Sequence, residues 1–166
     1  MKKILLFILL SVFVAGAAYA QKKEKKLSEK ELKTAQAVAK KMLDKDLVMY
    51  MSVLIHDYGK VALDGNRVSL VDDKFSCNLP YQGSSRINTY GSQDISITAD
   101  NAPVEVDSFY NEKKGFYKLT FSFKSSYDSE RFTATLKVFL SGKVTLDVSS
   151  SERGNVKYQG GLLIEM

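Results

Sequence analysis

The chain has 166 residues, of which 45% are hydrophobic and 11% aromatic. This length and composition suit one domain with its own core, and they exclude a disordered chain. The formal net charge of +5 is confined to the start of the chain, because six of the 24 basic residues and one of the 19 acidic residues precede Leu27. From Leu27 onward 18 basic residues balance 18 acidic ones, so the body lacks the basic groove that nucleic-acid binding requires.

Residues 1–20 have the layout of a Sec signal peptide. Two lysines are followed by an apolar run over residues 4–14 and by small residues that end in Ala18-Tyr19-Ala20, so cleavage is expected before Gln21. A buried helix and a membrane anchor are the alternatives, but the apolar run is short for a bilayer span and is ended abruptly by small residues. No cysteine follows the cleavage site. We therefore expect a periplasmic or secreted protein that is not a lipoprotein and has no membrane span after cleavage.

Residues 21–27 form a basic linker between the signal peptide and the domain. Four lysines and one glutamate lie in this stretch. A charge run of this kind is typical of a solvated linker, and the alternative is contact with anionic lipid or polysaccharide. Residues 28–166 are expected to form a single β-rich domain.

The domain is predicted to begin with a helix over residues 28–45. Apolar residues recur there at helical spacing, and Ser28 with Glu31 makes a capping box. The apolar stripe is narrow, so we expect it to face one partner, either a sheet edge or the end of a barrel.

From Leu47 onward the apolar residues recur at every second position, which predicts strands. Asp72 and Asp73 are interpreted as a hairpin turn, and Pro80 as the end of a strand. The predicted strands cover residues 50–55, 67–71, 74–79, 94–98, 104–109, 117–123, 132–140 and 144–148, with two short strands on either side of Gly160–Gly161. The expected fold is mainly β, an antiparallel sandwich or small barrel of about 8–10 strands with one N-terminal α-helix.

Catalytic residue types are scarce. His56 is the one histidine, and we interpret it as a strand-end residue hydrogen-bonded to a neighbour, with a general base as the alternative. Zinc sites draw on several His or Cys ligands, so we expect no metal site and no cofactor. Cys77 has no cysteine to pair with and lies on the apolar face of a predicted strand. Glu105 and Asp107 would project from one face about 7 Å apart, a spacing that acid/base chemistry uses, but alternation favours their interpretation as the wet face of a half-buried strand.

The aromatic residues are compatible with two kinds of protein interior. Eight tyrosines and seven phenylalanines follow residue 20. In a barrel they would line a cavity for a small apolar ligand, whereas in a sandwich they would fill the core.

The triplet Tyr-Gln-Gly occurs twice, at residues 81–83 and 158–160. Two turns of similar chemistry account for this, because each glycine permits a positive φ angle or a close backbone approach. The alternative is a ligand site shared by Tyr81, Gln82, Tyr158 and Gln159, since tyrosine and glutamine supply apolar surface together with hydrogen bonds.

A series of short motifs resembles an exported Bacteroidetes family catalogued as domain of unknown function 4251. The motifs, in order, are Leu79-Pro80-Tyr81-x-Gly83, Ser141-Gly142, Leu146-x-Val148, Arg153 and Tyr158-x-Gly160. The resemblance covers residues 30–164, although Gln82 replaces the aromatic residue expected after the tyrosine. It implies export and a β-rich domain, but no activity and no catalytic residue.

These observations favour a non-catalytic binding module of the cell envelope. Its partner would be a small lipophilic molecule, or a peptide or protein of the envelope. The alternatives are a hydrolase that uses carboxylates without histidine, and a structural or assembly protein of the envelope.

Overall fold

The computed structural model describes residues 28–56, 59–81, 96–127 and 130–164. The predicted signal peptide and basic linker lie outside these ranges. The described elements are α2 (Glu29–Leu43), β1 (Asp46–His56), β2 (Gly59–Val71), β3 (Lys74–Pro80), β4 (Ser96–Pro103), β5 (Asp107–Asn111), the 3-10 turn η1 (Glu112–Lys114), β6 (Phe116–Lys124), β7 (Arg131–Phe139), β8 (Lys143–Ser150) and β9 (Val156–Leu162).

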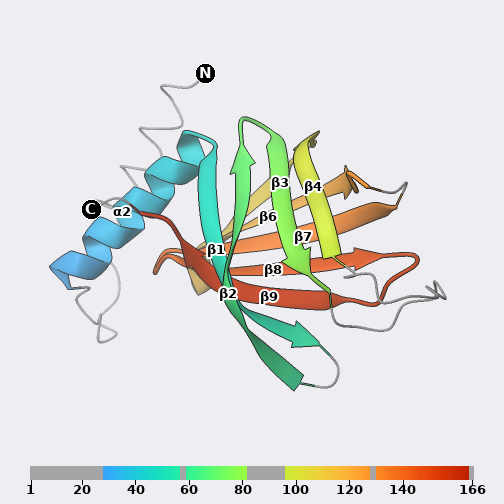
Figure 1. The fold of residues 1–166 in the computed structure, drawn as a ribbon. Helices are drawn as coiled ribbons and strands as arrows, with labels where there is room; N and C mark the ends of the chain where they lie inside the picture. The colour runs from blue at the N-terminus through green and yellow to red at the C-terminus, as the bar shows by residue number, and fades with distance from the viewer. Residues whose placement is uncertain (1–27, 57–58, 82–95, 128–129, 165–166) are drawn as a thin grey trace.

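Helix α2 begins at the predicted capping box. The backbone N–H of Ser28 donates to the Glu31 carboxylate at 2.8 Å, and the Ser28 hydroxyl accepts from the Glu31 N–H at 3.3 Å. The helix buries Val38 completely, and its Thr34 lies beside Gly142 in the β7–β8 turn. Helix α2 therefore lies at one end of the sheet, as the narrow apolar stripe predicts (Figure 1).

The nine described strands form one antiparallel sheet in the order β4-β3-β2-β1-β9-β8-β7-β6-β5. This sheet curls into a half-barrel, so that in Figure 1 strands β1 to β4 run steeply in front of the flatter strands β6 to β8. The predicted mainly β, antiparallel fold is confirmed. Of the two architectures left open, the protein has a single curled sheet rather than two separate ones.

The glycine pair near the C-terminus lies inside a strand, so the prediction of two short strands around it is wrong. Strand β9 runs through Gly160 and Gly161 and pairs with β1 on one side and β8 on the other. A Cβ atom added to Gly160 would lie 2.0 Å from the carbonyl oxygen of Tyr50. The glycine is therefore required for close approach of two backbones at the bulge between Met51 and Val53, not for a turn.

The region around Pro103 also differs from the prediction of a strand over residues 104–109. Strand β4 continues to Pro103, which pairs with Lys74 at the end of the ladder, and β5 begins only at Asp107. Proline fits this terminal position of an outer strand because it has no N–H to donate.

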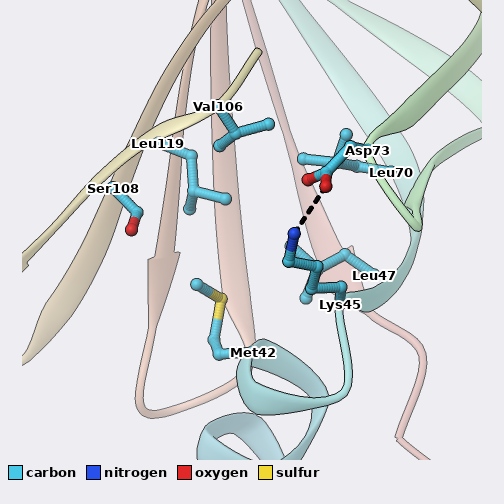
Figure 2. Close-up of a pocket in the computed structure, with 8 residues that line it drawn as sticks. All are labelled: Met42, Lys45, Leu47, Leu70, Asp73, Val106, Ser108 and Leu119. Carbon is cyan, nitrogen blue, oxygen red and sulfur yellow. Dashed lines mark hydrogen bonds and ion pairs between the residues drawn. The ribbon is translucent and has the colours of Figure 1, made fainter. Parts of the chain in front are cut away.

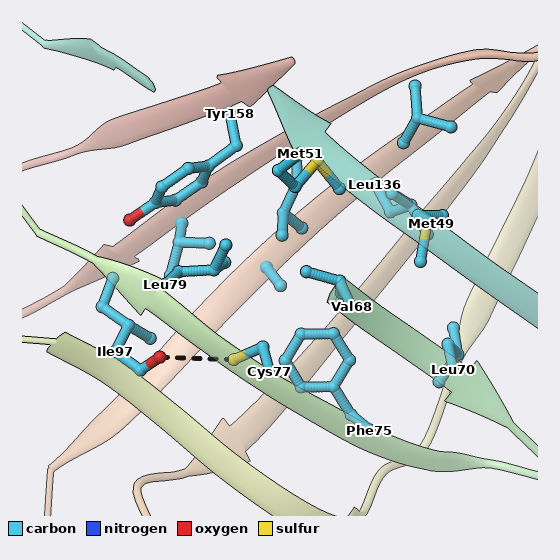
Figure 3. Close-up of a cluster of buried hydrophobic side chains, with 14 of the residues drawn as sticks. Met49, Met51, Val68, Leu70, Phe75, Cys77, Leu79, Ile97, Leu136 and Tyr158 are labelled. Carbon is cyan, nitrogen blue, oxygen red and sulfur yellow. Dashed lines mark hydrogen bonds between the residues drawn. The ribbon is translucent and has the colours of Figure 1, made fainter. Parts of the chain in front are cut away.

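The interior of the curled sheet is filled by the apolar side chains that alternate along its strands (Figure 3). The Phe75 ring lies 4.9 Å from the Phe121 ring and 4.7 Å from the Phe123 ring, measured between centroids. Phe123 stacks in turn on Phe132 at 5.3 Å. Each fully buried side chain of this size contributes about 1.5–3 kcal/mol to stability. The aromatic residues therefore act chiefly as core.

Candidate functional site

The two outermost strands of the sheet are consecutive in the sequence. Strand β4 pairs with β3 up to Pro103, and β5 pairs with β6 from Asp107 onward. Only residues 104–106 connect them, and an extended chain of that length spans at most about 14 Å. The two edges of the curled sheet therefore approach each other here. We call residues 96–111 the seam.

At the other end of β4 the seam is closed by Ser126, which follows β6. Its backbone N–H donates to the carbonyl oxygen of Thr98 at 3.0 Å, and its hydroxyl accepts from the N–H of Asp100 at 2.8 Å. Around residues 104–108 the chain has left β3 and begins to pair with β6. The two edges lie near each other there, and we call this stretch the gap.

A pocket of about 120 Å³ lies at this gap, between the C-terminal end of α2, the β2–β3 turn and the seam (Figure 2). Its polar lining consists of Lys45, Asp73 and Ser108. Its apolar walls are Met42, Leu47, Leu70, Val106 and Leu119. Apolar walls with a few polar groups are the usual composition of a recognition pocket.

The rim of the pocket combines an ion pair with unusual backbone geometry. The Lys45 ammonium lies 2.5 Å from an Asp73 carboxylate oxygen, and the N–H of Asp72 donates to the carbonyl of Lys45 at 3.0 Å. Lys45, Asp72 and Asp73 all have positive φ angles of 48–60°. The two aspartates form the predicted hairpin turn, but Lys45 occupies the position after the helix C-cap where glycine is favoured. A non-glycine residue there costs roughly 1 kcal/mol.

The Lys45–Asp73 ion pair adds little to the stability of the fold, because its side chains are 59% and 47% exposed and solvent screens their attraction. A left-handed residue directly after the C-cap commonly ends a helix, so the φ angle of Lys45 is explained by the termination of α2. The ion pair leaves both of its charged groups exposed at the mouth of the pocket.

Two tyrosines extend the pocket along the inner face of the sheet. Tyr110 pairs with Tyr117 across β5 and β6, with ring centroids 4.6 Å apart. Side chains alternate along a strand, so these rings lie on the same face as Ser108 and Leu119 of the pocket. Burial raises the pKa of the Tyr110 hydroxyl, and the nearby Glu112 raises it further. The pocket, its rim and this pair are called the seam site below.

The structure brings together two of the four residues that the sequence proposed as a ligand site. The Tyr158 hydroxyl donates to the carbonyl of Pro80 at 2.9 Å, next to Tyr81, whose hydroxyl donates to the carbonyl of Gly154 at 3.4 Å. Both tyrosines are buried, and burial raises the pKa of Tyr158. Gln159 points to the opposite face of β9, and Gln82 lies outside the described residues. Ligand binding by this set stays a prediction.

A buried ion pair beside these tyrosines was not foreseen. Arg153 Nε lies 2.8 Å from a carboxylate oxygen of Glu130, with the two side chains 9% and 2% exposed. The same guanidinium lies 5.5 Å from the Tyr81 ring and donates to the carbonyl of Ser96 at 3.2 Å. Arg153 stood out only through the family resemblance, and nothing in the local sequence marks Glu130 as buried. Through Ser96, Arg153 ties β4 to the chain between β8 and β9, and its ion pair with Glu130 adds the residue before β7.

The other candidate reactive groups do not converge. Cys77 is buried and donates to the carbonyl of Ile97 at 3.5 Å, and burial raises its pKa to about 12 (Figure 3). His56 ends β1, while Glu105 and Asp107 are exposed within the seam. Among the described residues no group of three His, Cys, Asp or Glu side chains is placed to hold a metal ion.

The described residues form a mainly β fold with a small pocket at the seam site. In the described ranges no helix has the length and apolar character needed to cross a membrane. The chain matches the family described as domain of unknown function (DUF4251) over residues 23–162, and it belongs to that family, as the sequence motifs indicated.

A solved structure has the same fold. It is the crystal structure of a DUF4251 family protein from Bacteroides eggerthii, with a TM-score of 0.55 and 10% sequence identity. The match covers 79% of this chain and 87% of that one. No curated protein matches the chain.

Proposed function

We propose that this protein is an exported, non-catalytic binding module whose seam site holds an apolar group of a peptide or protein partner in the cell envelope. The observation that carries the proposal is the pocket, with five apolar walls and an exposed ion pair at its mouth. Export rests on the signal-peptide layout of residues 1–20.

The size of the pocket favours a side chain over a whole lipophilic molecule. Drug-sized ligands occupy pockets of about 300–1,000 Å³, whereas an apolar cavity of about 150 Å³ accepts benzene. At about 120 Å³ the pocket suits one aliphatic side chain or a small ring. Because core side chains fill the interior of the curled sheet, a larger ligand would lie on the surface and insert only one group.

The chemistry of the pocket favours binding over catalysis. Its polar lining is limited to Lys45, Asp73 and Ser108, and the first two are paired with each other. Neither the histidine nor the cysteine lines it, and Glu105 and Asp107 are absent from its lining as well. The tyrosine pair beside it adds the aromatic surface that is common at recognition sites.

The test is native mass spectrometry of the mature chain, residues 21–166, purified gently from the envelope of its own host. The informative variant is Ser108→Phe, because Ser108 is an exposed strand residue whose enlargement fills the pocket. The matched control is Ser122→Phe, an exposed position on β6 away from the pocket.

We expect an additional bound mass in the wild type and in Ser122→Phe, and its loss in Ser108→Phe. A wild-type spectrum without bound mass, or a bound mass that Ser108→Phe retains, would contradict the proposal.

A further inference from the structure

We infer that the ligand of the seam site is an extended peptide that adds as a further strand to the free edge of β5, with an acidic side chain between two apolar ones. This inference rests on the proposed function and names its partner class. It is carried by the edge itself, by its position beside the pocket, and by the charges on the neighbouring strands.

The free edge of β5 offers hydrogen-bonding groups. Strand β5 is last in the sheet order and pairs with β6 alone among the described strands. In an antiparallel pair, alternate residues direct their N–H and C=O groups away from the partner strand. Residues 107–110 are exposed. An extended peptide would satisfy these groups by main-chain pairing, as in other cases of strand addition.

The two edges of the sheet differ in how they are protected. Strand β4 ends in Pro103, and Ser126 covers its backbone at Thr98 and Asp100. Strand β5 contains neither proline nor lysine, and its register with β6 is continuous, without a bulge. Natural sheets protect long-lived free edges with such devices. Proline and the backbone cover by Ser126 are found on β4 and not on β5, so the N–H and C=O groups on the β5 edge are open to pairing.

The alternation of β5 sets which side chains of an added strand meet the pocket. Ser108 and Tyr110 face inward, Ser108 lines the pocket, and Phe109 faces outward with 61% of its surface exposed. Peptide residues opposite Ser108 and Tyr110 would therefore place their side chains at the seam site. The residue between them would point outward beside Phe109.

Two lysines lie on the outer face beside Phe109, and Asp107 of β5 is on the same face. Phe109 is paired with Lys118 on β6, and Lys118 with Lys137 on β7, so the two lysines are direct cross-strand neighbours. Like charges in this position destabilise a sheet. Among the described residues no carboxylate forms an ion pair with either lysine, although Lys137 lies 6.0 Å from the Phe116 ring centroid.

An acidic side chain on the added strand would complement this pair. The added strand would lie two strand spacings, about 10 Å, from β6, a separation that a glutamate and a lysine side chain span together. The predicted recognition pattern is therefore apolar, acidic, apolar, with the acidic residue opposite Phe109.

The test titrates the ¹⁵N-labelled mature chain with the acetylated and amidated heptapeptide Thr-Ser-Leu-Glu-Leu-Ser-Thr and follows the amide resonances. Two further peptides carry backbone N-methyl groups, one on both leucines and the other on the glutamate and the two serines. The two peptides are therefore methylated on alternate N–H groups. Only alternate N–H groups of an added strand point toward β5, so only one of the two peptides loses its hydrogen bonds to β5.

We expect saturable shifts centred on residues 107–111, with binding abolished by one N-methylated set and retained by the other. A peptide with lysine in place of glutamate should bind about three-fold more weakly at low salt, and the difference should vanish in Lys118→Gln. Equal binding of both N-methylated peptides, or no shifts at millimolar peptide, would overturn the inference.

A parallel titration with benzene separates this inference from the proposed function. Saturable shifts of the Leu70 and Leu119 methyl resonances, absent in Ser108→Phe, would show that the pocket accepts an apolar group even if the peptide fails to pair. Failure of benzene as well would count against both proposals.

Discussion

Replacing Gly160 with alanine tests the close contact between β9 and β1. The new Cβ atom would lie 2.0 Å from the carbonyl oxygen of Tyr50, 2.8 Å from its carbon and 2.9 Å from the Cα atom of Met51. All three are backbone atoms, so no side-chain rotation relieves the overlap. The strands must separate by about 1 Å, which adds overpacking strain of about 1–3 kcal/mol and weakens adjacent ladder hydrogen bonds worth about 1 kcal/mol each. We expect the free energy of unfolding to fall by about 3–5 kcal/mol.

Gly161 provides the matched control, because a Cβ atom there would meet nothing closer than the carbonyl of Gly142 at 3.9 Å. Neither glycine has a positive φ angle, so conformational strain does not separate the two variants. Gly161→Ala should be neutral or stabilising by up to about 1 kcal/mol.

Urea unfolding of the mature chain, followed by circular dichroism, measures both variants. With a slope of about 2 kcal/mol per molar urea, Gly160→Ala should lower the midpoint by about 1.5–2.5 M. A Gly160→Ala variant within about 0.5 kcal/mol of wild type, or a Gly161→Ala variant that is the less stable of the two, would refute the reasoning.

Tyr158→Phe removes a buried hydrogen bond to a carbonyl and should lower the free energy of unfolding in urea by about 1–2 kcal/mol. Tyr81→Phe loses a longer hydrogen bond of 3.4 Å and should lower it by less. The reverse order would contradict the geometry. Arg153→Met removes the ion-pair partner of the buried Glu130 and should cost about 3–5 kcal/mol of stability. The double variant Glu130→Met/Arg153→Met should recover part of this loss in thermal unfolding. A double variant less stable than Arg153→Met would contradict this account of the buried pair. Burial raises the pKa of Cys77 from 9.0 to about 12, so the folded state holds the thiol proton more tightly than the unfolded state. Stability should therefore be unaffected by this group below about pH 9 and fall as the pH rises toward 12; the fall should be smaller in Cys77→Val, and identical pH profiles would exclude the effect.

The elements set by local chemistry could be predicted from the sequence. The capping box at Ser28 placed the start of α2, and Asp72–Asp73 placed the β2–β3 turn, because each depends on neighbours in the chain. The glycines of β9 were misinterpreted because glycine marks a turn and a close approach of backbones alike. Only the position of β1 distinguishes these two roles, and β1 is about a hundred residues away.

The seam site depends on the strand order, which the sequence did not reveal. Nothing near Val106 or Ser108 indicates that the chain leaves one edge of the sheet there and joins the other. The pocket also draws on the helix end and the β2–β3 turn, so its residues come from segments without a shared pattern. In contrast, Tyr81 and Tyr158 were grouped by a repeated triplet, and the structure does bring them together.

The place of β9 in the sheet has a consequence for when the protein folds. It is the last of the nine strands to leave the ribosome, yet it lies between β1 and β8 and joins the β1–β4 meander to the β5–β8 meander. Until residues 156–162 are available, the two meanders lack their common neighbour, and the pairing of β9 with β1 must close a very long loop. Such non-local pairing slows folding to milliseconds or longer. The native sheet should therefore form only after residues 156–162 have been synthesised, and a chain that still lacks them should not yet have its two meanders joined.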